Sequence, residues 1–416
     1  MCLSRAAAVA LLLAASAARA DATRTVSLAD VIAAVPSAPE APIAPGEVRA
    51  AEAEADAAGA WPAAPTLRGG TSRLTATLSL GVTVPLPIFG TLGAARDEAR
   101  AKARVVRSEA TIESRDLRRR AVAAWIALAR ADDEVGVRAA EAAQADALVT
   151  MTRTRLEAGT SAEVDVSMAV AAQARARVAV SAAQRAREAA GAQLAALLGW
   201  DPARPLASDG TWPGATLDAS LDGLRARLAA HPEHAAATAR VDAATAAAAR
   251  VRTLRIPGVA LDVEANIDDP TLPRRRGDDH DGHGTDLLAG VTLELPIFAH
   301  VGDQLRAAAA TTTVAKARLA ATDAQLAGGL VASYRTWEAA RDSAAALAAE
   351  VVPAQEKATA LAEQAFREGA RDLATALQAE RDLAAVRAEL AGARAELAMA
   401  WIELQVAAGE EPGGAR

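Results

Sequence analysis

The 416-residue sequence has almost no cysteine and few aromatic residues. Its only cysteine is Cys2, and Phe, Trp and Tyr together make up 2% of the chain. A lone cysteine excludes an internal disulfide framework and a thiolate metal site. Alanine supplies most of the 52% hydrophobic residues. Such small side chains suit closely packed helices better than a thick globular core.

The sequence also lacks an excess of basic residues and a long hydrophobic run. Residues 1–20 resemble a secretory signal, with Arg5, an apolar run over 6–15 and an Ala-x-Ala cleavage site at 18–20. The remainder holds 43 basic and 52 acidic residues, a net charge of −9 that argues against a nucleic-acid partner. No later stretch reaches 18 uninterrupted apolar residues, so we expect no transmembrane helix.

No nucleophile–base constellation, phosphate-binding loop or ordered metal motif is evident in the sequence. We therefore expect neither enzymatic activity nor a cofactor. The loop 274–284 carries His280 and His283 among aspartates, and these are weak candidate metal ligands. The loop lacks the fixed spacing of a closed metal site, so a solvated polar loop is the alternative.

One nine-residue segment occurs twice, 209 residues apart. Residues 81–89 read GVTVPLPIF, and residues 290–298 read GVTLELPIF. Each copy ends a run of alternating apolar and polar residues and precedes a long alanine-rich run, which predicts a strand, a stop and a helix in each half. We expect the proline to close the strand, because it lacks the N–H that a ladder needs. Phe89 and Phe298 would then anchor each half at a membrane interface.

Alternating segments predict two β-hairpins. Residues 74–84 alternate strictly between apolar side chains and Thr, Ser or Gly, which is typical of a strand with one apolar face. Eleven residues match a bilayer-crossing strand, although an amphipathic strand of a soluble sheet has the same pattern. We expect the first hairpin over about residues 65–86, with its turn at Gly69 and Gly70, and the second over about residues 258–296.

Three acidic residues, Asp262, Glu264 and Glu294, fall on the polar side of the second hairpin. In a barrel built from several copies, they would line the lumen with negative charge and favour cations. Any water-filled barrel carries some charges, so lumen carboxylates without a role in selectivity are the alternative.

Long proline-free runs predict two helical hairpins. Residues 91–157 would make a helix about 100 Å long. Gly159 would end it, and a second helix over 162–198 would return antiparallel. The second half repeats this hairpin over 301–408, with a kink at Pro353 and a turn at Gly369. The predicted parts are a signal (1–20), a first repeat (21–200), a linker (201–220), a second repeat (221–408) and a tail (409–416).

Each half supplies two strands, so one chain has four. Four strands cannot close a barrel, and an open sheet edge in lipid leaves backbone groups unpaired. The edges must therefore pair with other copies. Three chains would supply about twelve strands, enough to leave a water path, and the helices would continue from them as a tube of hairpins.

This duplicated order resembles the TolC-type outer-membrane efflux protein family. The paired Pro-Ile-Phe segments, His-Pro-Glu at 231–233 and the two glycine turns carry the resemblance, which covers essentially the whole predicted mature chain. Residues 84–89 resemble the heavy-metal (CzcC-like) branch. The resemblance implies a mainly α fold with a small β part: a homotrimeric β-barrel in outer-membrane lipid, continued by a periplasmic α-helical barrel. It also implies docking to a periplasmic adaptor and an inner-membrane pump of the RND type.

The resemblance further assigns roles to the two helical turns. The tips that would touch the adaptor are Ala158, Gly159, Thr160, Glu368, Gly369 and Ala370. Asp165 and Arg371 match positions of the family's closing network, and Phe366 belongs to the same gate. Thr375 and Gln378 stand where relatives carry a ring of aspartates, which is a departure from the family pattern. Ordinary solvated helix charges are the alternative for Asp165 and Arg371.

The function implied is a passive export duct, opened at its periplasmic tip by an adaptor and a pump, with heavy-metal cations as candidate cargo. One alternative is an outer-membrane channel for type I protein secretion or drug efflux. An alternative of another class is a soluble periplasmic coiled-coil scaffold, which would not need the alternating strands.

Overall fold

The computed structural model describes residues 23–58, 65–72, 77–86, 90–217, 219–268, 285–295 and 301–414. The chain divides into two compact units. The hairpin unit comprises Met1–Ile43, Ile112–His231 and Gln325–Arg416, and the sheet unit comprises Ala44–Thr111 and Pro232–Ala324. No helix in the described ranges is both long enough and apolar enough to cross a membrane.

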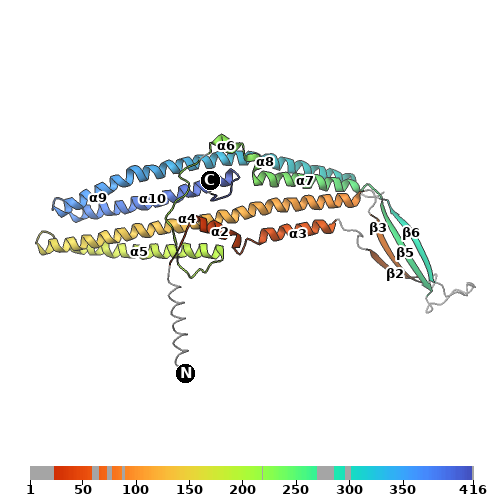
Figure 1. The fold of residues 1–416 in the computed structure, drawn as a ribbon, viewed down its shortest axis with the longest axis horizontal. Helices are drawn as coiled ribbons and strands as arrows, with labels where there is room; N and C mark the ends of the chain where they lie inside the picture. The colour runs from red at the N-terminus through yellow and green to blue at the C-terminus, as the bar shows by residue number, and fades with distance from the viewer. Residues whose placement is uncertain are drawn as a thin grey trace, which may run out of the picture. The chain divides into compact units, whose positions relative to one another are not determined.

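Two helical hairpins make up most of the hairpin unit (Figure 1). Helix α4 (Thr91–Glu157) turns back into α5 (Glu163–Leu198), and helix α9 (Val352–Arg367) turns back into α10 (Leu373–Ala407). Alanine-rich sequence without internal glycine clusters or proline favours α4, α5 and α10. The predicted helix over 91–157 is confirmed, and α5 begins one residue after its predicted start.

Helix α8 (Val301–Ala346) is separated from α9 by a π-helical turn at Leu347–Val351. Pro353 lies in the first turn of α9, where it has no backbone N–H to donate to the preceding turn. A π turn accommodates the missing backbone hydrogen bond without ending the helix. The predicted kink at Pro353 coincides with this irregular turn.

Short elements complete the core of the hairpin unit. Trp125 of α4 is fully buried, and its indole Nε1 donates to the Val26 carbonyl oxygen at 3.0 Å. Val26 ends strand β1 (Arg24–Val26), which pairs in parallel with β4 (Leu206–Ser208). The predicted linker over 201–220 therefore contains a strand that its sequence does not predict, because three residues are too few to show a period. The remaining short elements are α2 (Leu28–Ala34), η1 (Val35–Ser37), α6 (Leu221–Arg225) and η2 (Leu228–Ala230).

The sheet unit contains one antiparallel four-stranded sheet in the order β2-β3-β5-β6 (Figure 1). Its strands are β2 (Thr66–Ser72), β3 (Thr77–Leu86), β5 (Gly258–Asp268) and β6 (Thr285–Glu294). Helices α3 (Ile43–Ala58) and α7 (Pro232–Thr253) lead into the two strand pairs. Within this unit, Glu98 of α4 accepts from Lys102 at 2.6 Å and from Arg250 of α7 at 3.0 Å.

The strand register separates the sheet into two faces. Thr83 lies opposite Asp262, and Val82 lies opposite Val263, so successive pairs alternate between a polar and an apolar face. Large exposed apolar side chains gather on one face: Leu67, Leu78, Leu80, Leu261, Val263, Ile267, Leu287, Val291 and Leu293. Leu288 is an exception, because it pairs with Glu264 on the polar face and is 56% exposed.

One detail of the predicted hairpins is wrong. Gly69 and Gly70 lie inside β2, opposite Leu80 and Ser79, and do not form the turn. Glycine is uncommon in strand interiors, and this is why the pair indicates a turn when the sequence is considered alone.

Strand β3 continues through Pro85, which pairs with Ala260, and ends at Leu86. Pro85 lies beyond Thr83, which pairs with the first residue of β2, Thr66. In the described residues Pro85 therefore pairs only with β5. Pro87 and Pro296, the prolines that the two copies share, lie outside the described residues, so their role as strand ends stays a prediction.

Candidate functional site

Matching glycine turns end α4 and α9. Gly159 and Gly369 adopt φ of +71° and +80°, a left-handed conformation that side chains with a Cβ rarely adopt. The N–H of Thr160 donates to the Arg155 carbonyl oxygen at 2.8 Å, and the N–H of Ala370 donates to that of Ala365 at 2.8 Å. Both turns therefore satisfy the free carbonyls of a helix end in the same way.

The six residues predicted to form the tips are all exposed. These residues are Ala158, Gly159, Thr160, Glu368, Gly369 and Ala370. Short side chains and glycine leave backbone groups of the turns accessible to a partner. Their role in docking stays a prediction.

Arg155, in the last turn of α4, contacts both turns. Its Nη2 donates to the Thr160 carbonyl oxygen at 3.1 Å, and its Nη1 donates to the Phe366 carbonyl oxygen at the end of α9. The guanidinium carbon also lies 4.8 Å from the centre of the Phe366 ring. Arg155 therefore joins the two hairpins at their ends within one chain.

Nothing in the sequence around Arg155 indicates a special role for it. An arginine in the last turn of a helix is common, because a cation there is favoured by the helix dipole. The second turn has no matching arginine. Ala365 stands four residues before Gly369, whereas Arg155 stands four residues before Gly159. Only the approach of α9 gives Arg155 its second set of acceptors.

Phe366 is 2% exposed and lies at the centre of an apolar cluster beneath the turns. The cluster draws on both hairpins and consists of Leu148, Val149, Ala169, Phe366, Leu373, Ala376 and Leu377. The predicted gate residue Phe366 is thus a core side chain in the single chain. Its ring holds the hairpin ends together and also supports Arg155.

Asp165 and Arg371 do not pair with each other within the described chain. The Oδ2 atom of Asp165 accepts from the Ala162 N–H at 3.1 Å and from the Ser161 hydroxyl at 2.8 Å, which caps the first turn of α5. Arg371 is exposed just before α10. A contact between them on adjacent hairpins of different copies stays a prediction.

Thr375 and Gln378 of α10 each contact a neighbouring carboxylate, Asp372 at the N-cap and Asp382 within the helix. The backbone N–H of Thr375 donates to Asp372 Oδ1 at 3.1 Å, as does its hydroxyl, and these bonds lower the pKa of Asp372. Gln378 Nε2 donates to Asp382 Oδ1 at 2.8 Å. Acidic side chains therefore occur beside the predicted aspartate-ring positions, although not at them.

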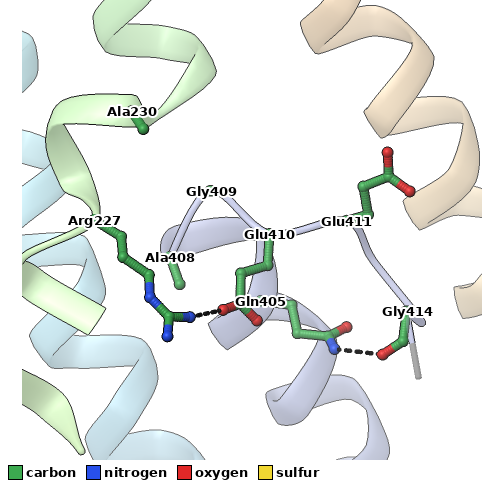
Figure 2. Close-up of a pocket in the computed structure, with 8 residues that line it drawn as sticks. All are labelled: Arg227, Ala230, Gln405, Ala408, Gly409, Glu410, Glu411 and Gly414. Carbon is green, nitrogen blue, oxygen red and sulfur yellow. Dashed lines mark hydrogen bonds and ion pairs between the residues drawn. The ribbon is translucent and has the colours of Figure 1, made fainter. Parts of the chain in front are cut away.

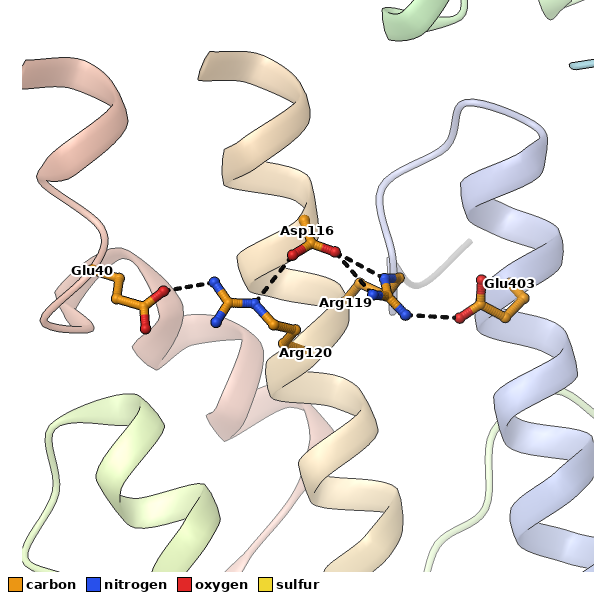
Figure 3. Close-up of polar contacts among 5 residues, drawn as sticks. All are labelled: Glu40, Asp116, Arg119, Arg120 and Glu403. Atoms are coloured by element: carbon orange, nitrogen blue, oxygen red, sulfur yellow. Dashed lines mark hydrogen bonds and ion pairs between the residues drawn. The ribbon is translucent and has the colours of Figure 1, made fainter. Parts of the chain in front are cut away.

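A chain of ion pairs crosses the hairpin unit far from the turns (Figure 3). Arg120 of α4 joins Glu40 at 2.6 Å to Asp116 at 3.1 Å, and Arg119 joins Asp116 at 3.0 Å to Glu403 of α10 at 3.0 Å. The hydrogen bond from Arg120 lowers the pKa of Glu40. Half-exposed pairs of this kind fix the relative position of helices more than they add stability.

A cavity of about 390 Å³ lies where the end of α10 meets the segment before α7 (Figure 2). Arg227 and Glu410 form an ion pair of 2.6 Å across it. Gln405 Nε2 donates to the Gly414 carbonyl oxygen at 3.4 Å, and its Oε1 accepts from the Gly413 N–H at 2.7 Å. These bonds attach the C-terminal segment to the helix that precedes it.

The histidines of the sequence do not form a metal site in the described residues. His231 Nε2 lies 3.0 Å from the Val406 carbonyl oxygen, and His234 Nδ1 lies 2.7 Å from Asp323 Oδ1. Across the described ranges, no three His, Cys, Asp or Glu side chains are arranged to hold a metal ion. His280 and His283 lie outside the described residues, as do Phe89 and Phe298.

Asp262 and Glu264 lie on the polar face of the sheet, as the alternation predicts. The hydroxyl of Thr83 on β3 donates to Asp262 Oδ1 at 2.5 Å, and that of Thr292 on β6 donates to Oδ2. Asp262 thereby links three adjacent strands. Glu294 ends β6 opposite Gly258, and its side chain lies outside the described part.

The model of one protein family matches most of this sequence. The family is described as outer membrane efflux protein, and it matches residues 44–200 and 224–410. The chain belongs to the outer membrane efflux protein family. Membership places it in the outer membrane as an efflux channel protein, and this sets aside the soluble scaffold. Among curated proteins, none matches the chain in sequence.

Solved structures of other outer-membrane proteins share the fold. VceC from Vibrio cholerae is 20% identical, with a TM-score of 0.74, and the match covers 92% of this chain and 96% of VceC. CusC is 17% identical, with a TM-score of 0.77 and coverage of 93% and 94%. The open state of the MtrE channel from Neisseria gonorrhoeae is 16% identical, with a TM-score of 0.71 and coverage of 92% and 89%. The predicted order of strand and helical hairpins is therefore that of known outer-membrane channels.

Proposed function

We propose that the chain is one subunit of a homotrimeric export duct. Its hairpin turns close the periplasmic entrance until a periplasmic adaptor and an inner-membrane pump of the RND type dock. The observation that carries this proposal is the four-stranded sheet with one exposed apolar face and one face of hydroxyls and carboxylates.

The outer strands of the sheet favour several copies. In the described part, β2 pairs only with β3 and β6 pairs only with β5. An apolar face suits lipid, but strand edges left open in lipid would leave N–H and C=O groups unpaired. Three copies joined edge to edge would pair every edge and enclose the polar face.

The contacts beneath the turns support a closed resting state. Arg155 and the Phe366 cluster hold the ends of the two hairpins together in one chain. An adaptor that binds the six exposed tip residues would act directly on these contacts. Asp165 and Arg371 would add a latch between copies, contributing about 0–1 kcal/mol if exposed, which is weak enough for an adaptor to release.

Heavy-metal cations are the proposed cargo. Asp262 and Glu264 on the polar face would repeat threefold around the lumen and favour cations over anions. Drugs or secreted proteins are the competing cargoes. A strain that lacks the gene separates them: lost tolerance to metal salts supports metal export, whereas lost tolerance to drugs alone would remove it.

Conductance of the purified protein in planar bilayers tests the duct itself. We expect few openings from the protein alone and frequent openings after the adaptor is added to the side with the hairpin turns. Absence of any aqueous conductance, with or without the adaptor, would contradict the proposal.

A further inference from the structure

A carboxyl group without a cationic partner is buried at the joint between the two hairpins. Glu380 of α10 is 7% exposed, and its Oε1 has no hydrogen-bond partner in the described part of the chain. The side chain lines a small cavity of about 50 Å³ together with Leu148 of α4 and Ala172 of α5. A buried carboxylate in such a place is costly unless it is paired or protonated.

A second carboxyl group, that of Glu363, acts on Glu380. After burial, a hydrogen bond with Glu363 of α9 is the largest contribution to the raised pKa of Glu380. Glu363 Oε1 also accepts from Gln144 Nε2 of α4 at 3.2 Å. Two carboxyl groups can share a hydrogen bond only if one of them carries a proton. The bond therefore exists while the pair holds one proton and is replaced by repulsion when both groups are ionised.

The other charged groups at this joint come from all four helices. Glu141 of α4 adds repulsion, and its carboxylate is held by Arg138 at 3.0 Å. Arg175 of α5 and Arg381 of α10 line the same cavity. Arg387 of α10 attracts Glu380 but pairs with Glu356 of α9 at 2.7 Å, and Arg367 lies 4.0 Å from Glu363. None of these cations makes a hydrogen bond or ion pair with Glu380 in the described residues.

Burial and the neighbouring Glu363 raise the pKa of Glu380 to about 8. Because the pKa of Glu380 is higher in the packed joint than in water, protonated Glu380 stabilises the packed joint. That stabilisation is complete below the ordinary value of 4.5 and is lost progressively as pH rises to about 8.

We propose that Glu380 makes the contact of α10 with α4 and α5 proton-operated: loss of its proton leaves a charge buried between the two hairpins, and their separation, which hydrates that charge, favours opening of the duct. The effect on opening rests on the proposed channel function. The joint lies one to three helical turns from Phe366 and Leu373, so separation there would loosen the cluster that supports Arg155. The ligand that acts at this joint is the proton.

Conductance of the full-length protein between about pH 5 and about pH 9 tests the proposal. The ratio of open to closed states should rise by up to about tenfold per pH unit and level off above about pH 8. Glu380→Gln keeps a donor for Glu363 but cannot ionise, so its ratio should stay at the acid value. Glu363→Gln removes the repulsion and should flatten the rise. Glu389→Gln, an exposed residue on the same helix, is the matched control and should behave as wild type.

A second measurement keeps this inference separate from the channel function. The thermal unfolding midpoint of the protein in detergent should fall as pH rises toward about 8 in wild type, and the Glu380→Gln variant should lose this part of the dependence. If wild type and Glu380→Gln show the same pH dependence, in conductance or in unfolding, the proposal that Glu380 controls the joint is wrong. The protein could instead show no conductance at any pH while wild type and Glu380→Gln still differ in the pH dependence of unfolding. That result would contradict the proposed channel function but would still show that Glu380 titrates in the folded protein.

Discussion

The Arg155 side chain donates a hydrogen bond to the Phe366 carbonyl oxygen and lies over the ring of the same residue, 4.8 Å from its centre. The two residues are 211 positions apart and end different helical hairpins. One side chain thus fixes the distance between the hairpin ends.

Replacing Arg155 by alanine should loosen the closed tip. The Phe366 carbonyl oxygen loses a charged donor at a part-buried place, which costs about 2 kcal/mol, and the Thr160 carbonyl oxygen loses one at an exposed place, where water can replace it. We expect more frequent openings in bilayer conductance and a lower unfolding midpoint. Arg153→Ala, at an exposed position one half-turn earlier, is the control. Equal gating of the two variants would show that Arg155 does not hold the tip.

Replacing Phe366 by alanine should destabilise the hairpin unit. The ring is 2% exposed, and its removal leaves a cavity among Leu148, Leu373 and Leu377, at a cost of about 3–5 kcal/mol. Denaturant unfolding in detergent measures this loss. Leu361→Ala on the same helix removes a side chain that is 57% exposed and should change stability by less than about 0.5 kcal/mol. A small loss at Phe366 would mean that the cluster is not packed as described.

Replacing either turn glycine by alanine should destabilise the tips. Gly159 and Gly369 have positive φ, where a Cβ costs about 1–2 kcal/mol. A Cβ at Gly369 would also meet Arg155 Nη2 at 3.5 Å, whereas nothing lies within 4 Å of one at Gly159. The 3.5 Å approach is an ordinary van der Waals contact, so we expect Gly369→Ala and Gly159→Ala to alter conductance to a similar extent, through backbone strain alone. Gly136→Ala, inside α4 with open space around it, should instead stabilise the helix by about 0.5–1 kcal/mol.

Replacing Asp165 by asparagine separates its two possible roles. The asparagine oxygen can still accept from the Ala162 N–H, so the cap of α5 should survive and stability should change little. If Asp165 also pairs with Arg371 of a neighbouring copy, the loss of charge should increase openings, and Arg371→Ala should add nothing further. Unchanged closure in both variants would leave Asp165 with only its capping role.

The long elements of the fold follow from the sequence because their signals are repeated many times. The 67 residues of α4 contain no proline, and β3 and β5 alternate over most of their lengths. Strands β1 and β4 have three residues each and show no period, so only their pairing reveals them. The two glycines of β2 indicate a turn locally, but the register with β3 places them in the strand.

The site is less predictable than the fold because its contacts are tertiary. Spacing identifies Gly159 and Gly369 as turns, and both adopt the left-handed conformation that this role requires. No local pattern indicates that Arg155 reaches α9 or that Glu380 faces Glu363, since both depend on how the hairpins pack. Asp165 shows the reverse: a predicted gate charge has a local task as a helix cap.

Native mass spectrometry of the purified protein released from detergent micelles tests the central claim most directly. One copy supplies a four-stranded sheet whose outer strands each pair on one side only in the described residues, so a stable particle should contain three copies. A folded single copy that remains intact in micelles and still conducts in bilayers would contradict the account.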